Sequence, residues 1–262
     1  MTRRSREVGI IKSCVLGAAL AAALAIPAQA DSKLSLSATT VFTTDYIFRG
    51  ISNSNENPAA QPEFDLTYGI FYAGIWGSNV DFGGAIGPGG NVKDVATIEI
   101  DYYAGITPTW KGIAFNFGAL YYTYPGAFDP AAELDYFEAK AAASYTFGQK
   151  LTLGVTNYWS PEFASETGNA DALEGSVAYA FSGKVFNFFS PTVSGGVGRQ
   201  WVEDSLDYTY WNAGLTLGFM EHWSADVRYF DTDFSEAECF AFTAVSANNC
   251  DARVVGTLKA VF

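Results

Sequence analysis

Apolar and polar residues alternate strictly along several stretches of this chain. Between residues 96 and 106 the even positions are Ala, Ile, Ile, Tyr, Ala and Ile, whereas Thr97, Glu99 and Asp101 stand between them. The odd positions of 137–147 and of 211–219 are apolar in the same way. A two-residue period places successive side chains on opposite faces of a β-strand. The pattern therefore predicts strands with one apolar and one polar face.

Such strand-like segments follow one another from residue 34 to the end of the chain. We expect twelve of them, and an even number suits a closed antiparallel sheet. Their predicted ranges are 34–49, 60–67, 70–81, 95–106, 112–124, 133–147, 150–161, 170–181, 190–203, 207–219, 223–232 and 251–262.

The connections between these segments alternate between long and short, as in bacterial barrels with long outer loops and tight periplasmic turns. Two connections break the rule, because 182–189 is too long for a turn and 204–206 is short for an outer loop. The strands around residues 180–210 are therefore the least certain part of this count. A soluble lipocalin-like barrel or a sandwich would also show alternating strands, with the apolar face turned inward.

The first 30 residues have the pattern of an export signal. Basic residues precede the apolar stretch 14–26, and Ala28 and Ala30 form a small-x-small cleavage site. The apolar stretch is shorter than the roughly 20 residues that a membrane-spanning helix needs. We expect 1–30 to be a secretory signal peptide and 31–262 to form an outer-membrane β-barrel.

The last segment is an amphipathic strand from Arg253 that ends on the aromatic residue Phe262. A terminal strand of this kind is typical of outer-membrane barrels, where the barrel-assembly machinery recognises it. Together with the export signal it predicts an all-β fold, an antiparallel transmembrane β-barrel of about 12 strands in the bacterial outer membrane. Lipid and lipopolysaccharide are then expected partners.

Strand parity predicts which side chains line the lumen. If Leu34, Leu36, Phe42, Tyr46 and Phe48 face lipid, Asp45 and Arg49 face inward, because a charged residue in lipid near the midplane costs roughly 2–4 kcal/mol. The lumen-lining candidates are Asp45, Arg49, Glu63, Asp65, Glu99, Asp101, Glu138, Lys140, Asp226 and Arg228, with Arg253 and Lys259 on the last strand. Tyr103, Tyr122 and Tyr124 could fill much of a lumen of this size.

The first predicted strand places Asp45 and Arg49 about 13 Å apart at a rise of roughly 3.3 Å per residue, too far for a direct ion pair. Any partner must therefore come from another strand. The shared parity of Arg49 and Glu63 suggests that these two side chains approach each other near the outer mouth. Independent solvated charges are the alternative.

Cysteine and histidine are scarce. Cys14 lies in the expected signal peptide, so Cys239 and Cys250 remain, and in an oxidising compartment we expect them to form a disulfide. His222, the only histidine, falls in a predicted turn. No phosphate-binding glycine loop or metal-ligand cluster is visible, so we expect no cofactor.

The chain is strongly acidic, with a formal charge of −13, which becomes −16 once residues 1–30 are removed. Such a charge disfavours a nucleic-acid partner, because phosphate binding relies on Lys and Arg. The predicted outer loops would form an acidic rim that favours cations and could bind divalent ions shared with lipopolysaccharide. Its residues are Glu56, Asp129, Glu162, Glu166, Asp204, Glu236 and Glu238.

Four segments carry a resemblance to a known family. They are Thr44-Asp45-Tyr46-Ile47-Phe48-Arg49-Gly50-Ile51-Ser52, the stretch 71–82, Glu99-Ile100-Asp101-Tyr102-Tyr103-Ala104-Gly105, and Tyr121-Tyr122-Thr123-Tyr124-Pro125-Gly126. In these segments the chain resembles the TorF family of porins. The resemblance implies an outer-membrane barrel of porin type whose solute is poorly defined, and it implies no catalytic residues.

These observations favour a channel for the passive diffusion of small hydrophilic solutes with mild cation selectivity. The alternative is a structural or adhesion barrel whose lumen is plugged by its own side chains. We expect no enzymatic activity. Hydrolysis through a serine or aspartate needs a histidine beside it, and His222, the only histidine, lies on the predicted periplasmic side, away from an outer-leaflet substrate.

Overall fold

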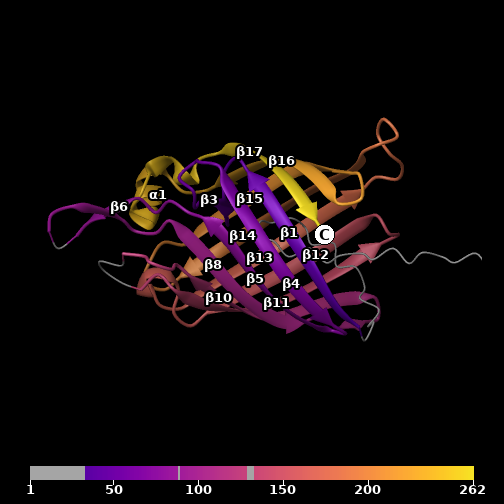
Figure 1. Ribbon diagram of the computed structural model, residues 1–262, viewed down its shortest axis with the longest axis horizontal. Helices are drawn as coiled ribbons and strands as arrows, with labels where there is room; N and C mark the ends of the chain where they lie inside the picture. The colour runs from indigo at the N-terminus through magenta and orange to yellow at the C-terminus, as the bar shows by residue number, and fades with distance from the viewer. Residues whose placement is uncertain (1–32, 88, 129–132) are drawn as a thin grey trace, which may run out of the picture.

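The computed structural model describes residues 33–87, 89–128 and 133–262, which form a closed antiparallel β-barrel (Figure 1). The expected signal peptide at 1–30 and the rim residue Asp129 lie outside the described residues. Among the described residues, no helix is both long and apolar enough to cross a bilayer.

Twelve long strands make the barrel wall, as the sequence predicted. Each strand pairs with the next in the chain, and β1 pairs with β17 to close the barrel, with Thr39 opposite Val261. The strands are β1 (Leu34–Thr43), β4 (Ala59–Tyr68), β5 (Phe71–Asn79), β8 (Ile98–Ile106), β10 (Ile113–Thr123), β11 (Tyr136–Phe147), β12 (Leu151–Ser160), β13 (Ala170–Ala180), β14 (Ser190–Val202), β15 (Tyr208–Phe219), β16 (Trp223–Thr232) and β17 (Arg253–Val261).

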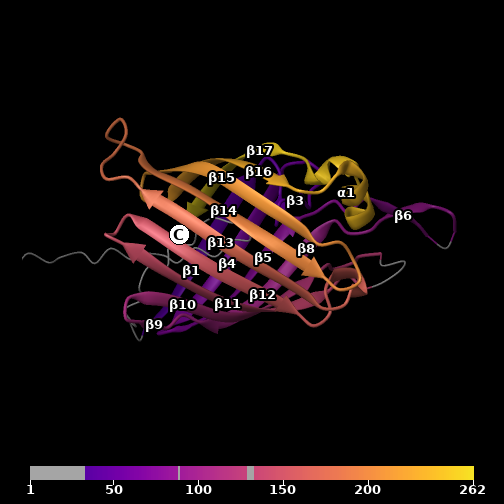
Figure 2. The ribbon, with the colours of Figure 1, turned by 180° about the vertical axis from the view of Figure 1, so that it is seen from behind.

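The remaining elements lie in the connections. They are β2 (Ile47–Phe48), β3 (Ile51–Ser52), β6 (Gly84–Ile86), β7 (Val92–Asp94), β9 (Thr109–Trp110), η1 (Ala164–Glu166), α1 (Glu236–Thr243) and η2 (Ala247–Cys250). The helix α1 and the β6–β7 hairpin lie at one end of the barrel, which we call the loop end (Figures 1 and 2). The C-terminus lies toward the other end, the turn end.

The two connections that broke the predicted length rule keep the strand count intact. The long connection 181–189 joins β13 to β14, and the short connection 203–207 joins β14 to β15. Both flanking strand pairs have continuous registers, with Ala172 opposite Gln200 and Gly196 opposite Asn212. The strands predicted around residues 180–210 are therefore confirmed.

The outer face of the barrel is apolar, and aromatic residues lie toward both ends. Leu36 is 75% exposed and Phe64 is 60% exposed, as expected for side chains directed at lipid. Toward the loop end, the exposed aromatics include Tyr121, Phe137, Trp159 and Trp201. Toward the turn end, they include Tyr68, Phe71, Trp110, Tyr145, Phe147, Tyr179 and Trp223. Such girdles mark the two interfaces of a membrane barrel.

The first strand is shorter than predicted. It ends at Thr43, and residues 44–58, which we call the inner loop, turn into the barrel with the β2–β3 hairpin. The prediction that Tyr46 and Phe48 face lipid is therefore wrong, because Tyr46 is 1% exposed and Phe48 packs against the same internal cluster. The prediction that Asp45 and Arg49 lie on one extended strand is also wrong, because β1 ends at Thr43.

Candidate functional site: the barrel lumen and its inner loop

The polar faces of the strands meet inside the barrel. Glu63 and Asp65 lie on β4, Glu99 and Asp101 on β8, and Glu138 on β11, and each is at most 8% exposed. Lys140 is also on β11, partly buried, and Asp226 and Arg228 are on β16. Asp45 and Arg49 are buried as well, but they belong to the inner loop rather than to the barrel wall.

The inner loop reaches the wall through a tight hairpin at Arg49 and Gly50. Both residues have positive φ, 47° and 85°, and glycine takes this conformation readily. A Cβ on Gly50 would lie 2.7 Å from Cγ2 of Thr232 and 2.8 Å from Cβ of Tyr210. The hairpin therefore presses its backbone against β15 and β16, and only glycine fits there.

Arg49 extends from this hairpin to the opposite wall. Its guanidinium donates two hydrogen bonds of 2.8 Å to the carboxylate of Glu138 and one of 2.8 Å to Oε1 of Gln200. The rings of Phe48 and Tyr158 each lie 4.7 Å from the guanidinium carbon. A charge-assisted bidentate pair with aromatic faces beside it is strong and directional. This pair, the Arg49–Glu138 latch, fixes the hairpin across the lumen.

The hypothesis that Arg49 approaches Glu63 is wrong. Arg49 bonds Glu138, while Glu63 and Asp65 both accept hydrogen bonds from the hydroxyl of Tyr103, at 2.9 and 2.6 Å. The parity argument assumed that residues 44–49 continued the first strand. Because the chain turns inward after Thr43, Arg49 instead reaches a strand on the far side of the lumen.

A second contact of the inner loop is made by Tyr46. Its hydroxyl donates to Oε1 of Glu99 at 3.1 Å, and its ring lies 5.3 Å from that of Trp76. The cluster around it is aromatic and almost inaccessible to water; its buried members are Tyr46, Ala59, Trp76, Val80, Ala96, Tyr122, Tyr124 and Tyr136. The inner loop and this cluster together occupy the loop-end half of the lumen.

A third contact ties the base of the inner loop to the last strand. Asp45 accepts hydrogen bonds from Ser52 and Ser54 at 2.6 and 2.9 Å and from Arg253 at 2.8 Å. Ile51 packs beside Cys239 and Cys250, which are joined by a disulfide between α1 and η2. The segment closed by this disulfide therefore packs on the inner loop at the loop end of the barrel.

The turn-end half of the lumen carries its own polar network. Arg228 donates to Asp226 at 3.1 Å, to Oδ1 of Asn212 at 2.7 Å and to Oγ of Ser194 at 2.8 Å. Lys140, two residues after Glu138 on β11, lies 5.6 Å from the ring of Tyr158. No group of His, Cys, Asp and Glu side chains within the described part of the chain could hold a metal ion.

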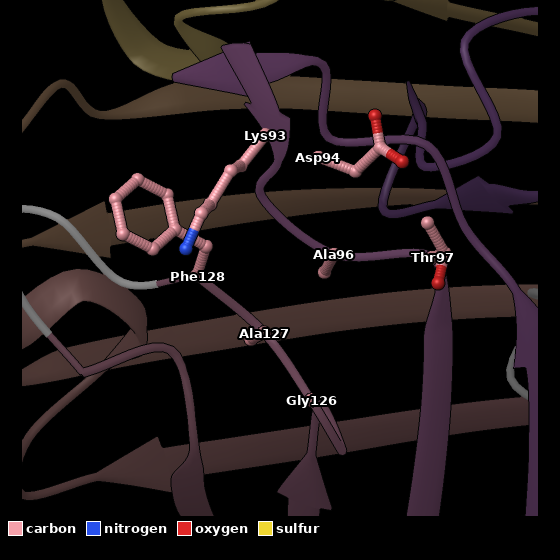
Figure 3. A pocket seen from close by; sticks show the side chains of 7 residues that line it. All are labelled: Lys93, Asp94, Ala96, Thr97, Gly126, Ala127 and Phe128. Atoms are coloured by element: carbon pink, nitrogen blue, oxygen red, sulfur yellow. The ribbon is translucent and has the colours of Figure 1, made fainter. Parts of the chain in front are cut away.

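Two hollows open at the loop end. One, of about 460 Å³, lies between residues 93–97 and 126–128, and Figure 3 shows the Lys93 side chain reaching across the ring of Phe128, 4.9 Å from its centroid. The other, of about 340 Å³, is lined by residues that include Asp45, Glu56 and Arg253. The Arg253 guanidinium lies 3.7 Å from Glu56, so an acidic residue predicted for the rim takes part in this contact.

Sequence reasoning missed several lumen residues. Gln200 and Tyr158 contact Arg49, and Glu174 accepts a 2.7 Å hydrogen bond from Tyr210. Strand parity could have found them, because Val155, Val177 and Val197 on the same three strands are exposed to the outside. The inward turn of residues 44–58 had one signal, the glycine that follows Arg49.

The comparisons with known proteins agree with this architecture. A protein-family model described as "Bacterial protein of unknown function (Gcw_chp)" matches residues 27–262. The chain belongs to the Gcw_chp family. This description states no function, and the resemblance to the TorF family is not confirmed by it. No curated protein matches the sequence.

Solved structures similar to this Gcw_chp protein include porins. A KdgM porin in complex with disordered oligogalacturonate has a TM-score of 0.55 at 7% identity, covering 87% of this chain and 98% of that one. The NanC porin has a TM-score of 0.50 at 9% identity, covering 87% and 98%. At such identities the similarity establishes the fold, a 12-stranded barrel of the kind found in porins.

Proposed function

We propose that this Gcw_chp protein is an outer-membrane channel of porin type that passes small hydrophilic solutes, with the inner loop as its constriction. The observation that carries the proposal is the division of the wall into an apolar outer face and a charged inner face. On β4, Phe64 and Leu66 are exposed outside, whereas Glu63 and Asp65 on the same strand are buried inside. A closed barrel with this division satisfies its backbone in lipid and keeps a polar path through it.

The proposed channel favours cations. The described lumen holds more carboxylates than basic groups: Asp45, Glu63, Asp65, Glu99, Asp101, Glu138, Glu174 and Asp226 face Arg49, Lys140, Arg228, Arg253 and Lys259. Carboxylates along a pore concentrate cations. Since several of these groups neutralise each other in ion pairs, the selectivity is modest.

A reversal potential in a salt gradient tests both parts of the proposal. The protein is refolded into a planar bilayer with ten times more KCl on one side. We expect discrete conductance steps, with a reversal potential shifted from zero toward the equilibrium potential of potassium. A reversal potential on the chloride side would contradict the cation preference, and a folded but silent barrel would contradict the channel.

A plugged barrel with a structural or adhesion role is the second candidate. It is favoured by the burial of Arg49 and Tyr46, which are 6% and 1% exposed although they lie in the lumen. The plugged barrel would be supported if the folded parent protein gave no conductance and a variant without the inner loop gave none either.

The outer surface fits the proposed location. Lipid and lipopolysaccharide would contact the apolar band and its girdles. The barrel-assembly machinery would recognise β17, whose Val254 and Leu258 are exposed on the outer face and which leads to the exposed Phe262. Replacing Phe262 by Asp should then lower assembly in cells while refolding in detergent is unchanged. Equal loss in both assays would contradict this role.

A further inference from the structure

Two carboxyl groups of the lumen wall lack a counter-charge. Glu99 and Asp101 are two residues apart on β8, so both point inward, and they are only 1% and 3% exposed. Oε2 of Glu99 and Oδ1 of Asp101 have no hydrogen-bond partner among the described residues.

The three arginines of the lumen pair with other carboxylates. Arg49 pairs with Glu138, Arg228 with Asp226, and Arg253 with Asp45. No ion pair in the described part of the chain includes Glu99 or Asp101. The register partners of Asp101 on the two adjacent strands are Trp76 and Tyr122, which carry no positive charge. The immediate surroundings of the pair are therefore aromatic.

The other titratable groups facing this pair do not neutralise it. They are Tyr46 from the inner loop, Tyr122 and Tyr124 from β10 and the residue after it, and Glu138 from β11. Tyrosines are neutral near pH 7, and Arg49 already binds Glu138. Two buried carboxylates without a counter-ion repel each other and lose their hydration, which is a large energetic cost.

We propose that Glu99 and Asp101 form a proton-binding site that keeps the inner loop seated in the lumen, and that release of the proton to bulk water frees the loop and opens the pore. This rests on the proposed channel function. With a proton on the pair, the Tyr46 hydroxyl rests on Glu99 and the aromatic cluster stays dry. With both groups ionised, the two carboxylates repel each other and draw in water at the place that Tyr46 occupies.

The direction of the response follows from the charge. The closed state binds the extra proton, so raising the pH favours the open state, by up to about tenfold per pH unit for each proton released. Glu99→Gln and Asp101→Asn imitate the protonated groups and should hold the channel closed at every pH. Asp65→Asn removes an equal charge from another lumen carboxyl, one that Tyr103 already bonds, and should keep the response.

Open probability from pH 5 to pH 9 in planar bilayers is the first measurement. We expect it to rise with pH in the parent protein and in Asp65→Asn, and to stay low in Glu99→Gln/Asp101→Asn. An equal rise in the double variant would overturn the proposal. So would an open probability that follows the KCl concentration at fixed pH, because a metal cation rather than a proton would then neutralise the pair.

A thiol-labelling experiment reports on the loop without requiring conductance. Ile47, 5% exposed and packed on Phe230 and Val255, is replaced by Cys, and its reaction with a membrane-impermeant maleimide is followed against pH. Ile86→Cys, at an exposed site, is the control that should react at every pH. Labelling of Cys at position 47 that rises with pH in a silent barrel would keep this proposal and refute the channel. A conducting barrel whose labelling at position 47 does not change with pH would support the channel and refute the proton-binding site.

Discussion

The guanidinium of Arg49 and the carboxylate of Glu138 form two parallel hydrogen bonds of 2.8 Å across the barrel lumen. Both side chains are nearly inaccessible to water, at 4% and 2% exposure. A loop residue is thereby fixed to a wall strand far along the chain. The contact makes the inner loop a part of the barrel interior rather than a free surface loop.

Removing one partner of this latch should be more harmful than removing both. Arg49→Gln leaves Glu138 buried without a cation and should lower the free energy of unfolding by about 3–5 kcal/mol. Arg49→Gln/Glu138→Gln should recover a large part of the loss, because no unpaired charge remains. Urea unfolding in detergent micelles measures the double-mutant cycle. Strictly additive single losses would show that the two side chains do not interact.

Gly50 should be intolerant of any side chain. Alanine costs about 1–2 kcal/mol in the left-handed region. At Gly50 a clash with Thr232 and Tyr210 would add about 1–3 kcal/mol. Gly69→Ala is the matched control, because Gly69 has φ of 60° and nothing lies within 4 Å of its added Cβ. Thermal unfolding of the two variants gives the comparison, and equal losses would argue against the close approach of the hairpin to β15 and β16.

The disulfide should stabilise the loop end and, through Ile51, the inner loop. Cys239 and Cys250 are separated by 11 positions, and closing a short loop of this kind contributes about 2–4 kcal/mol. Cys239→Ala/Cys250→Ala should lower stability by this amount and make the inner loop more accessible to proteases. Proteolysis of the barrel with and without reductant tests it. Identical fragment patterns would mean that the inner loop does not depend on the bridge.

The start of α1 should weaken in acid. The Ser235 hydroxyl and backbone N–H donate to Glu238, at 2.6 and 2.9 Å, and lower the pKa of that carboxyl below its ordinary value of 4.5. A depressed pKa means that the contribution is fully present above pH 4.5 and is lost as the pH falls through the folded value. Amide exchange in α1 should therefore quicken between pH 5 and pH 3, after correction for intrinsic rates, and Glu238→Gln should reduce that change. An unchanged acid response in the variant would contradict it.

The wall of the barrel was predictable and the inner loop was not. Lipid favours apolar residues at outward positions, so strand parity predicts that Glu63, Glu99 and Glu138 point inward, and all three side chains are buried in the structure. The same alternation continues through Tyr46 and Phe48, because a hairpin packed on an aromatic cluster also needs one apolar face. Pattern alone therefore could not separate a longer strand from an inward turn. The choice of Glu138 as partner, 89 positions from Arg49, depends on the closed barrel and on Gly50.

Single-channel conductance of a variant without the inner loop shows whether this loop narrows the pore. Residues 45–57 are replaced by a short Gly-Ser linker, and the variant is compared with the parent protein in symmetric KCl at pH 7. We predict small or infrequent steps for the parent and a larger, steadily open conductance for the variant. A folded variant barrel that remains silent, or one whose conductance equals that of the parent, would contradict the account of the inner loop as the constriction of this channel.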